Sequence, residues 1–151
     1  MNNLTPVKCV FIYKTMNGTL QPSFTCSKYT LSVNIFVTSW YNIGIIYFPL
    51  KCFLHEKFEE KAAQAAEIGM KYLICPYIGP QTSVDNWKKV TDKFNACGEI
   101  CKKNGIRFAY HNHAYSFKAF SGMIPHDFIM DNTDPELVDH EMDIYWVVTG
   151  G

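Results

Sequence analysis

Beyond residue 55 the sequence alternates between helix-like and strand-like segments, and this alternation restricts the fold more than any other feature. Helix formers with one apolar face are followed by short apolar runs, each bounded by glycine or proline. Helices are expected at 55–69, 83–104 and 124–132, and strands at 70–78, 106–113 and 136–148. Consecutive strands joined by helices run parallel, so the sequence predicts an α/β fold.

Two sheet architectures are compatible with this alternation. An open, doubly wound nucleotide-binding sheet is disfavoured, because neither GxGxxG nor GxxxxGK follows any expected strand. The pattern suits part of a (β/α)8 TIM barrel, whose full length is about 250 residues. The sequence therefore predicts a partial TIM barrel with parallel strands in residues 55–151.

Residues 1–54 differ in composition from the rest of the chain. They contain no acidic residue, since the first is Glu56, and their apolar residues follow little period. The stretch 31–50 is uncharged and about long enough to span a bilayer, although Asn34, Asn42 and Pro49 interrupt it. We expect an atypical N-terminal segment here rather than a membrane span. Core strands, or a segment foreign to the domain, remain alternatives.

Charge and cysteine content narrow the functional classes. The chain carries 14 basic and 14 acidic residues, which argues against a nucleic-acid surface because such a surface needs excess Lys and Arg. The 6 cysteines show no paired spacing. We interpret them as small buried hydrophobic residues in a reducing compartment, which favours a cytoplasmic location.

The polar residues at the expected strand ends are the best candidates for chemistry. Ligands of parallel α/β proteins gather at the carboxyl ends of the strands. Strand alternation puts Ala109, His111 and His113 on one face of their strand. Glu141, Asp143 and Tyr145 would share a face of the last strand, where carboxylates are costly to bury without compensation. His111 and Asp143 are therefore predicted to bind a divalent metal ion.

Other polar residues receive more modest roles. Glu141 is interpreted as a metal ligand or a base, with a structural partner as the equal alternative. His113 lies past the strand end and is expected to orient substrate. His55, His126 and His140 are interpreted as surface residues.

Three quoted stretches also carry a family resemblance. "GMKYLICPYI", "NGIRFAYHNH" and "NTDPELVDHEMDIYWV", with the spacing between them, resemble the sugar phosphate isomerase/epimerase group of xylose isomerase-like TIM barrels. The resemblance covers roughly residues 55–151. It implies a divalent metal (Mn, Co, Mg or Zn) held at the barrel mouth and a small sugar, keto sugar or polyol as substrate.

Taken with the strand-end residues, the resemblance predicts a metal-dependent isomerase or epimerase of a sugar or keto sugar. His111 and Asp143 would hold the metal, and Glu141 would be a third ligand or the catalytic base. Asn112, His113 and Tyr145 would line the substrate pocket. His111 stands where relatives often have a Glu ligand, and Ser116 replaces their usual acidic residue.

The same residues are compatible with alternative functions. A lyase or hydrolase of keto sugars would use the same residues. A catalytically silent barrel fragment is the main non-enzymatic alternative, with self-association through exposed barrel edges. A DNA-repair enzyme of the endonuclease IV type is disfavoured by the neutral charge and the few histidines.

Overall fold

The computed structural model describes residues 9–11 and 56–151. Its strands are β1 (Cys9–Phe11), β2 (Tyr72–Cys75), β3 (Arg107–His111) and β4 (Val138–Met142). Its helices are α1 (Glu56–Glu67), α2 (Val84–Lys103), α3 (Pro125–Asp131) and α4 (Ile144–Gly150), with the short 3₁₀ helix η2 (Ala114–Ser116). Residues 12–55, with the uncharged stretch 31–50 and His55, lie outside the described residues. The predicted division at residue 54 therefore stays a prediction.

The strands form one parallel sheet in the order β1-β4-β3-β2. Strands β2, β3 and β4 are neighbours in chain order, as in a TIM barrel, and helices connect them. Strand β1 is out of sequence, because it pairs with β4 rather than with β2. The predicted α/β class, part of a TIM barrel with parallel strands, is confirmed for the segment from β2 to β4.

The helix boundaries follow the local chemistry of the sequence. The Ser83 side chain caps α2 by accepting a hydrogen bond from the Asn86 amide, which satisfies one free N–H of the first turn. Two lysines lie in the last turn of α2, and Gly105 follows with a φ of +73° that favours glycine. Pro125 opens α3, where its missing N–H has no cost.

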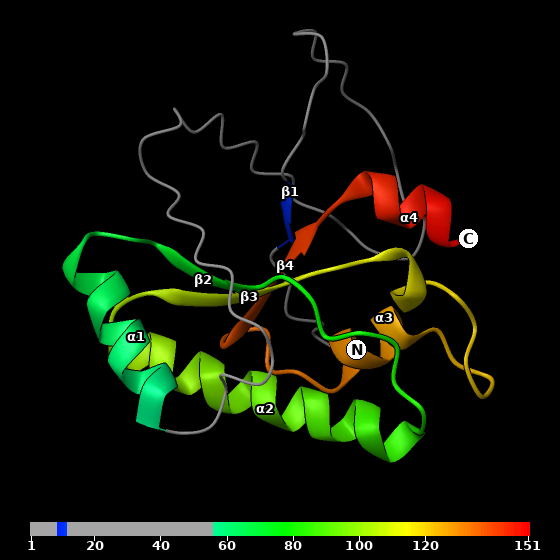
Figure 1. The fold of residues 1–151 in the computed structure, drawn as a ribbon, viewed down its shortest axis with the longest axis horizontal. Helices are drawn as coiled ribbons and strands as arrows, with labels where there is room; N and C mark the ends of the chain where they lie inside the picture. Colours follow the sequence, from blue (N-terminus) through cyan, green and yellow to red (C-terminus); the bar gives the residue numbers. More distant parts are fainter. Residues whose placement is uncertain (1–8, 12–55) are drawn as a thin grey trace, which may run out of the picture.

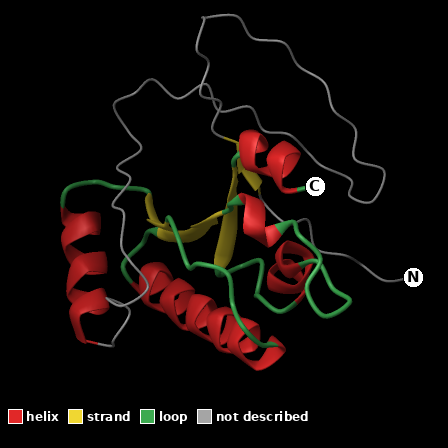
Figure 2. Cartoon of the chain, turned by 45° about the vertical axis from the view of Figure 1, so that its right-hand side comes forward, coloured by secondary structure: helices red, strands yellow, loops and turns green. Residues whose placement is uncertain are grey.

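The hydrophobic core lies between the sheet and the helices α1, α2 and α3. Figure 1 shows α1 and α2 below the sheet and α4 above it, and the turned view in Figure 2 shows the same separation. Phe108 and Tyr110 of β3 pack against Phe94 of α2 with tilted rings, at 5.3 and 5.1 Å between ring centroids. Gly98 lets α2 approach the segment just before β4 closely, because an added Cβ would lie 2.5 Å from the Leu137 carbonyl oxygen.

The described cysteines belong to this core. Cys75, Cys97 and Cys101 are buried free thiols. Burial raises the pKa of Cys75 and of Cys101 to about 12, so both thiols stay neutral and unreactive. Their predicted role as small buried hydrophobic residues is confirmed.

Two predictions about the last third of the chain are wrong. The expected strand 136–148 ends at Met142, and a helix begins at Ile144 because Asp143 caps its first turn. His126 and His140, predicted at the surface, are 2% and 1% exposed. Their rings lie 5.2 Å apart between α3 and β4. Amphipathic patterns do not separate a buried histidine from an exposed one.

Candidate functional site

The carboxyl ends of β3 and β4, here called the mouth end, bring His111 and Glu141 together. The two residues are direct partners in the parallel register. His111 Nδ1 lies 3.5 Å from Glu141 Oε2, and both side chains are largely buried. Neither atom has a hydrogen-bond partner within the described residues. Buried polar atoms without partners are uncommon in folded proteins and often mark functional sites.

Asp143 approaches the opposite edge of the same imidazole. Its Oδ2 lies 3.9 Å from His111 Nε2. Its Oδ1 accepts a hydrogen bond of 2.9 Å from the Tyr145 amide, which is the N-cap contact of α4. The structure therefore brings together the three residues that the sequence nominated for metal binding and catalysis, with His111 between two carboxylates.

The geometry does not make all three residues ligands of one ion. His111 presents Nδ1 to Glu141 and Nε2 to Asp143, so the two carboxylates face different nitrogens. Within the described part of the chain, no group of three or more His, Cys, Asp or Glu side chains is arranged to hold a metal ion. The donor chemistry of the His111 Nε2 and Asp143 pair nevertheless fits a divalent cation.

Asn112 occupies a different environment from the one predicted. Its side chain is fully buried, donates through Nδ2 to the Asp143 carbonyl oxygen at 3.0 Å, and accepts at Oδ1 from the Asp143 amide at 2.7 Å. Both ends of the amide are therefore engaged inside the protein. The structure gives Asn112 a contact with Asp143 in place of the expected contact with substrate.

His113 lies in a cluster of aromatic rings at the mouth end. Its imidazole stacks on Trp146 of α4 at 5.1 Å and on Tyr115 of η2 at 5.8 Å. Tyr77, just beyond β2, packs edge-on against it at 5.1 Å. Burial, followed by the charge of His111, lowers the pKa of His113, which favours the neutral ring. We refer to His113, Tyr77, Tyr115 and Trp146 as the aromatic cluster.

The sequence reasoning missed three members of the aromatic cluster. Tyr77, Tyr115 and Trp146 each follow a strand end by a few residues, and this position was the available signal. The Tyr115 hydroxyl also accepts from the amides of Ile78 and Gly79, at 3.3 and 3.2 Å, and so ties the loop after β2 to η2. Tyr145, nominated for the pocket, lies on α4 rather than on a strand and is 65% exposed.

Ser116 does not point toward the mouth. Its hydroxyl shares a hydrogen bond of 2.8 Å with the Tyr110 hydroxyl, and both side chains are buried. An acidic residue in this position would be placed in the core between β3 and η2. The serine therefore stabilises the packing of η2.

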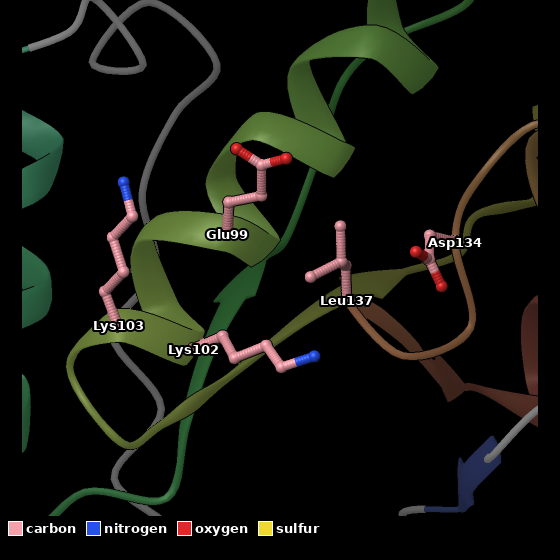
Figure 3. A pocket seen from close by; sticks show the side chains of 5 residues that line it. All are labelled: Glu99, Lys102, Lys103, Asp134 and Leu137. Atoms are coloured by element: carbon pink, nitrogen blue, oxygen red, sulfur yellow. The ribbon is translucent and has the colours of Figure 1, made fainter.

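A shallow groove of about 420 Å³ lies at the other end of the sheet. Figure 3 shows it between the last turns of α2 and the segment that leads into β4, lined by Glu99, Lys102, Lys103, Asp134 and Leu137. These residues precede β3 and β4, whereas His111 and Asp143 follow the same strands. The groove is thus distant from the polar strand ends and mixed in charge.

Parallel strands joined by helices, with polar residues at their carboxyl ends, are typical of α/β scaffolds such as the TIM barrel. The structure is similar to two crystal structures of sugar phosphate isomerase/epimerases from Parabacteroides distasonis. The first has 32% identity and a TM-score of 0.62, over 72% of this chain and 44% of that one. The second has 38% identity and a TM-score of 0.58, over 63% and 38%. The predicted resemblance to sugar phosphate isomerase/epimerases is confirmed.

The extent of the match is limited. The chain spans less than half the length of either structure. No protein-family model matches the sequence, and no curated protein matches it. Within the described residues, none of the helices combines the length and apolar character that crossing a membrane would need.

Proposed function

We propose that this chain is part of a metal-dependent isomerase or epimerase that acts on a sugar or keto sugar. The observation that carries the proposal is His111, held between the carboxylates of Glu141 and Asp143 at the mouth end. The similarity to sugar phosphate isomerase/epimerases supports the reaction class and the small sugar substrate.

His111 Nε2 and Asp143 would hold the metal, which supplies a positive charge that polarises the substrate carbonyl. Glu141 faces the other nitrogen of His111. A carboxylate that accepts from the second N–H of a metal-binding histidine fixes its tautomer and its ring orientation. With Nδ1–H turned toward Glu141, Nε2 would be the lone-pair nitrogen that faces Asp143.

Glu141 also remains the predicted catalytic base. It is 5% exposed, and its Oε2 has no hydrogen-bond partner within the described residues. Isomerases and epimerases of keto sugars need a group that removes a proton from the carbon beside the carbonyl. In the aromatic cluster, a neutral His113 and the rings around it would contact the sugar and orient it, and Tyr145 would line the outer part of the pocket.

The first experiment measures metal binding. Mn²⁺ or Co²⁺ should bind at one equivalent and raise the thermal midpoint by linkage, and the double variant His111→Ala/Asp143→Ala should lose both effects. Asp92→Ala is the matched control, since it removes an exposed carboxylate on α2. Equal metal binding by the double variant, or none by folded wild-type protein, would contradict the metal site.

The second experiment measures proton abstraction without knowing the product. A panel of aldoses, ketoses and keto sugars is incubated with the protein and metal in D₂O. An isomerase or epimerase should exchange the proton next to the carbonyl, seen by proton NMR, and Glu141→Gln should abolish this exchange. Cleavage of the sugar would favour a lyase or hydrolase, and an unchanged panel would favour a silent fragment.

The same geometry supports a second candidate. An imidazole paired with a buried carboxylate can transfer protons by itself, with Glu141 orienting His111 as the general base. This metal-independent chemistry predicts deuterium exchange that persists in EDTA and depends on His111 but not on Asp143. Exchange that EDTA abolishes would exclude it.

A further inference from the structure

Asn112 joins the two strand ends of the candidate site through a pair of hydrogen bonds. It directly follows His111, and its amide bonds to both the N–H and the C=O of Asp143. The Asn112 amide nitrogen thus donates to the Asp143 carbonyl oxygen, and the Asn112 amide oxygen accepts from the Asp143 N–H. This pair of hydrogen bonds ties the Asp143 backbone to the residue that follows β3.

The Asp143 backbone lies at the junction of two elements, and its carbonyl oxygen also accepts from the Val147 amide at 3.2 Å in the first turn of α4. Strand β4 ends at Met142 and α4 begins at Ile144, so Asp143 lies between the two elements. Helix α4 has 7 residues, and Tyr145 and Val148 on it are 65% and 75% exposed. A helix this short depends on tertiary contacts, which here are the packing of Gly150 against Ala114 and the tie from Asn112 to its N-cap residue.

Small movements of this backbone matter for the site. Asp143 Oδ1 is occupied by the cap of α4, which leaves Oδ2 to face His111 Nε2 across 3.9 Å. Because metal–ligand distances vary little, a shift of Asp143 by 1 Å would separate the two donors from a shared ion. The two hydrogen bonds from Asn112 are placed to restrain Asp143 at this distance.

We infer that Asn112 is a positioning residue that sets the distance between His111 and Asp143 and so tunes their affinity for a divalent cation. The inference rests on the proposed metal site. Asn112 is buried at 0% exposure and touches Asp143 rather than the ion. Its replacement should act through Asp143 alone.

The test is a double-mutant cycle for Co²⁺ affinity, with the visible spectrum of bound Co²⁺ as a report on ligand geometry. Asn112→Leu keeps the approximate size of the side chain and removes both hydrogen bonds. It should weaken Co²⁺ binding about tenfold or more, in the range measured for outer-shell partners, and change the spectrum. In an Asp143→Ala background, the same substitution should have no further effect on affinity.

Asn95 offers a matched control at the other end of the sheet. Its amide donates to the Asn132 carbonyl oxygen at 3.2 Å and accepts from the Asp134 amide at 2.8 Å. Asn95→Leu removes the same kinds of hydrogen bond and should lower the thermal midpoint while leaving Co²⁺ affinity unchanged. Asn112→Asp keeps only the bond from the Asp143 amide and should fall between wild type and Asn112→Leu.

The outcomes separate this inference from the proposed function. Weaker Co²⁺ binding by Asp143→Ala, with unchanged affinity and spectrum in Asn112→Leu, overturns the inference and leaves the metal site intact. If Asn112→Leu lowers the Co²⁺ affinity equally in the wild-type and Asp143→Ala backgrounds, the inference is also overturned, because the effect would then not pass through Asp143. Absence of Co²⁺ binding by wild-type protein overturns both.

Discussion

One face of the sheet carries, at each end, an acidic side chain beside a nitrogen-bearing one, and the two pairs are built differently. At the amino ends of β3 and β4, here called the base end, Arg107 donates to both oxygens of Asp139 and to the carbonyls of Pro135 and Glu136. At the mouth end, His111 and Glu141 lie 3.5 Å apart without a hydrogen bond. Both pairs join β3 to β4. Arg107 and His111 are four residues apart on β3, and Asp139 and Glu141 are two residues apart on β4.

This difference in hydrogen bonding suggests that the base-end pair stabilises the fold and that the mouth-end pair serves binding. Asp139 is 0% exposed, and the planar guanidinium of Arg107 satisfies it in a bidentate pair that raises the Arg107 pKa through the hydrogen bonds. The mouth end leaves buried polar atoms available for a ligand. Sites of chemistry commonly give up local stability in this way. We therefore expect base-end substitutions to unfold the chain and mouth-end substitutions to change binding.

Arg107→Ala should have the largest effect on stability. It leaves the Asp139 carboxylate buried without a partner, and breaking a buried pair in this way costs about 3–5 kcal/mol. The free energy of unfolding from urea titrations measures the loss. Arg107→Lys keeps the charge without the bidentate geometry and should cost less. A loss below about 1 kcal/mol for Arg107→Ala would contradict the stabilising role of the base-end pair.

His126 tests whether unsatisfied polar atoms cost stability away from the mouth. Its imidazole faces Tyr110, Phe117 and His140, and neither of its nitrogens has a partner within the described residues. Burial lowers the pKa of His126 to about 4, from an ordinary 6.5. The unfolded chain therefore binds a proton that the folded chain excludes, and the folded state loses stability as the pH falls from 6.5 to about 4.

His126→Leu should remove this part of the acid sensitivity. The full effect is about 3 kcal/mol, because one pKa unit corresponds to about 1.4 kcal/mol. Urea titrations of both proteins at pH 7.5 and at steps down to pH 4 give the comparison. The difference in unfolding free energy between variant and wild type should grow in the variant's favour below pH 6.5. A constant difference across this range would show that His126 does not titrate in the core.

The sequence predicted the elements that local chemistry controls. Ser83, Gly105 and Pro125 mark helix ends through hydrogen bonding and backbone geometry that do not depend on the rest of the fold. The alternation of helices and strands was sufficient for the parallel sheet. His111 and Asp143 followed from a general rule about strand ends, and the structure brings them within 3.9 Å.

Tertiary packing decided what the sequence did not reveal. The apolar run after Asp143 has a strand-like composition, yet it is helical because Asp143 caps it and Gly150 lets it pack against Ala114. The pairing of β1 with β4 joins segments far apart in the chain, for which periodicity carries no signal. The role of Asn112 depends on a contact with a residue 31 positions away.

Glu141→Gln should have the smallest effect on stability and completes the comparison. The substitution keeps the shape of the side chain and replaces a buried carboxylate. The Oε2 atom of Glu141 forms no hydrogen bond within the described residues. The unfolding free energy at pH 7.5 should therefore change by less than about 1 kcal/mol. Asp139→Asn is the matched change at the base end and should cost more, because Arg107 then loses its charged partner. Urea titrations of the two variants side by side decide the point. If Glu141→Gln destabilises the chain as much as Asp139→Asn does, then the mouth-end pair stabilises the sheet as the base-end pair does. Its polar atoms without hydrogen-bond partners would then not be reserved for a ligand.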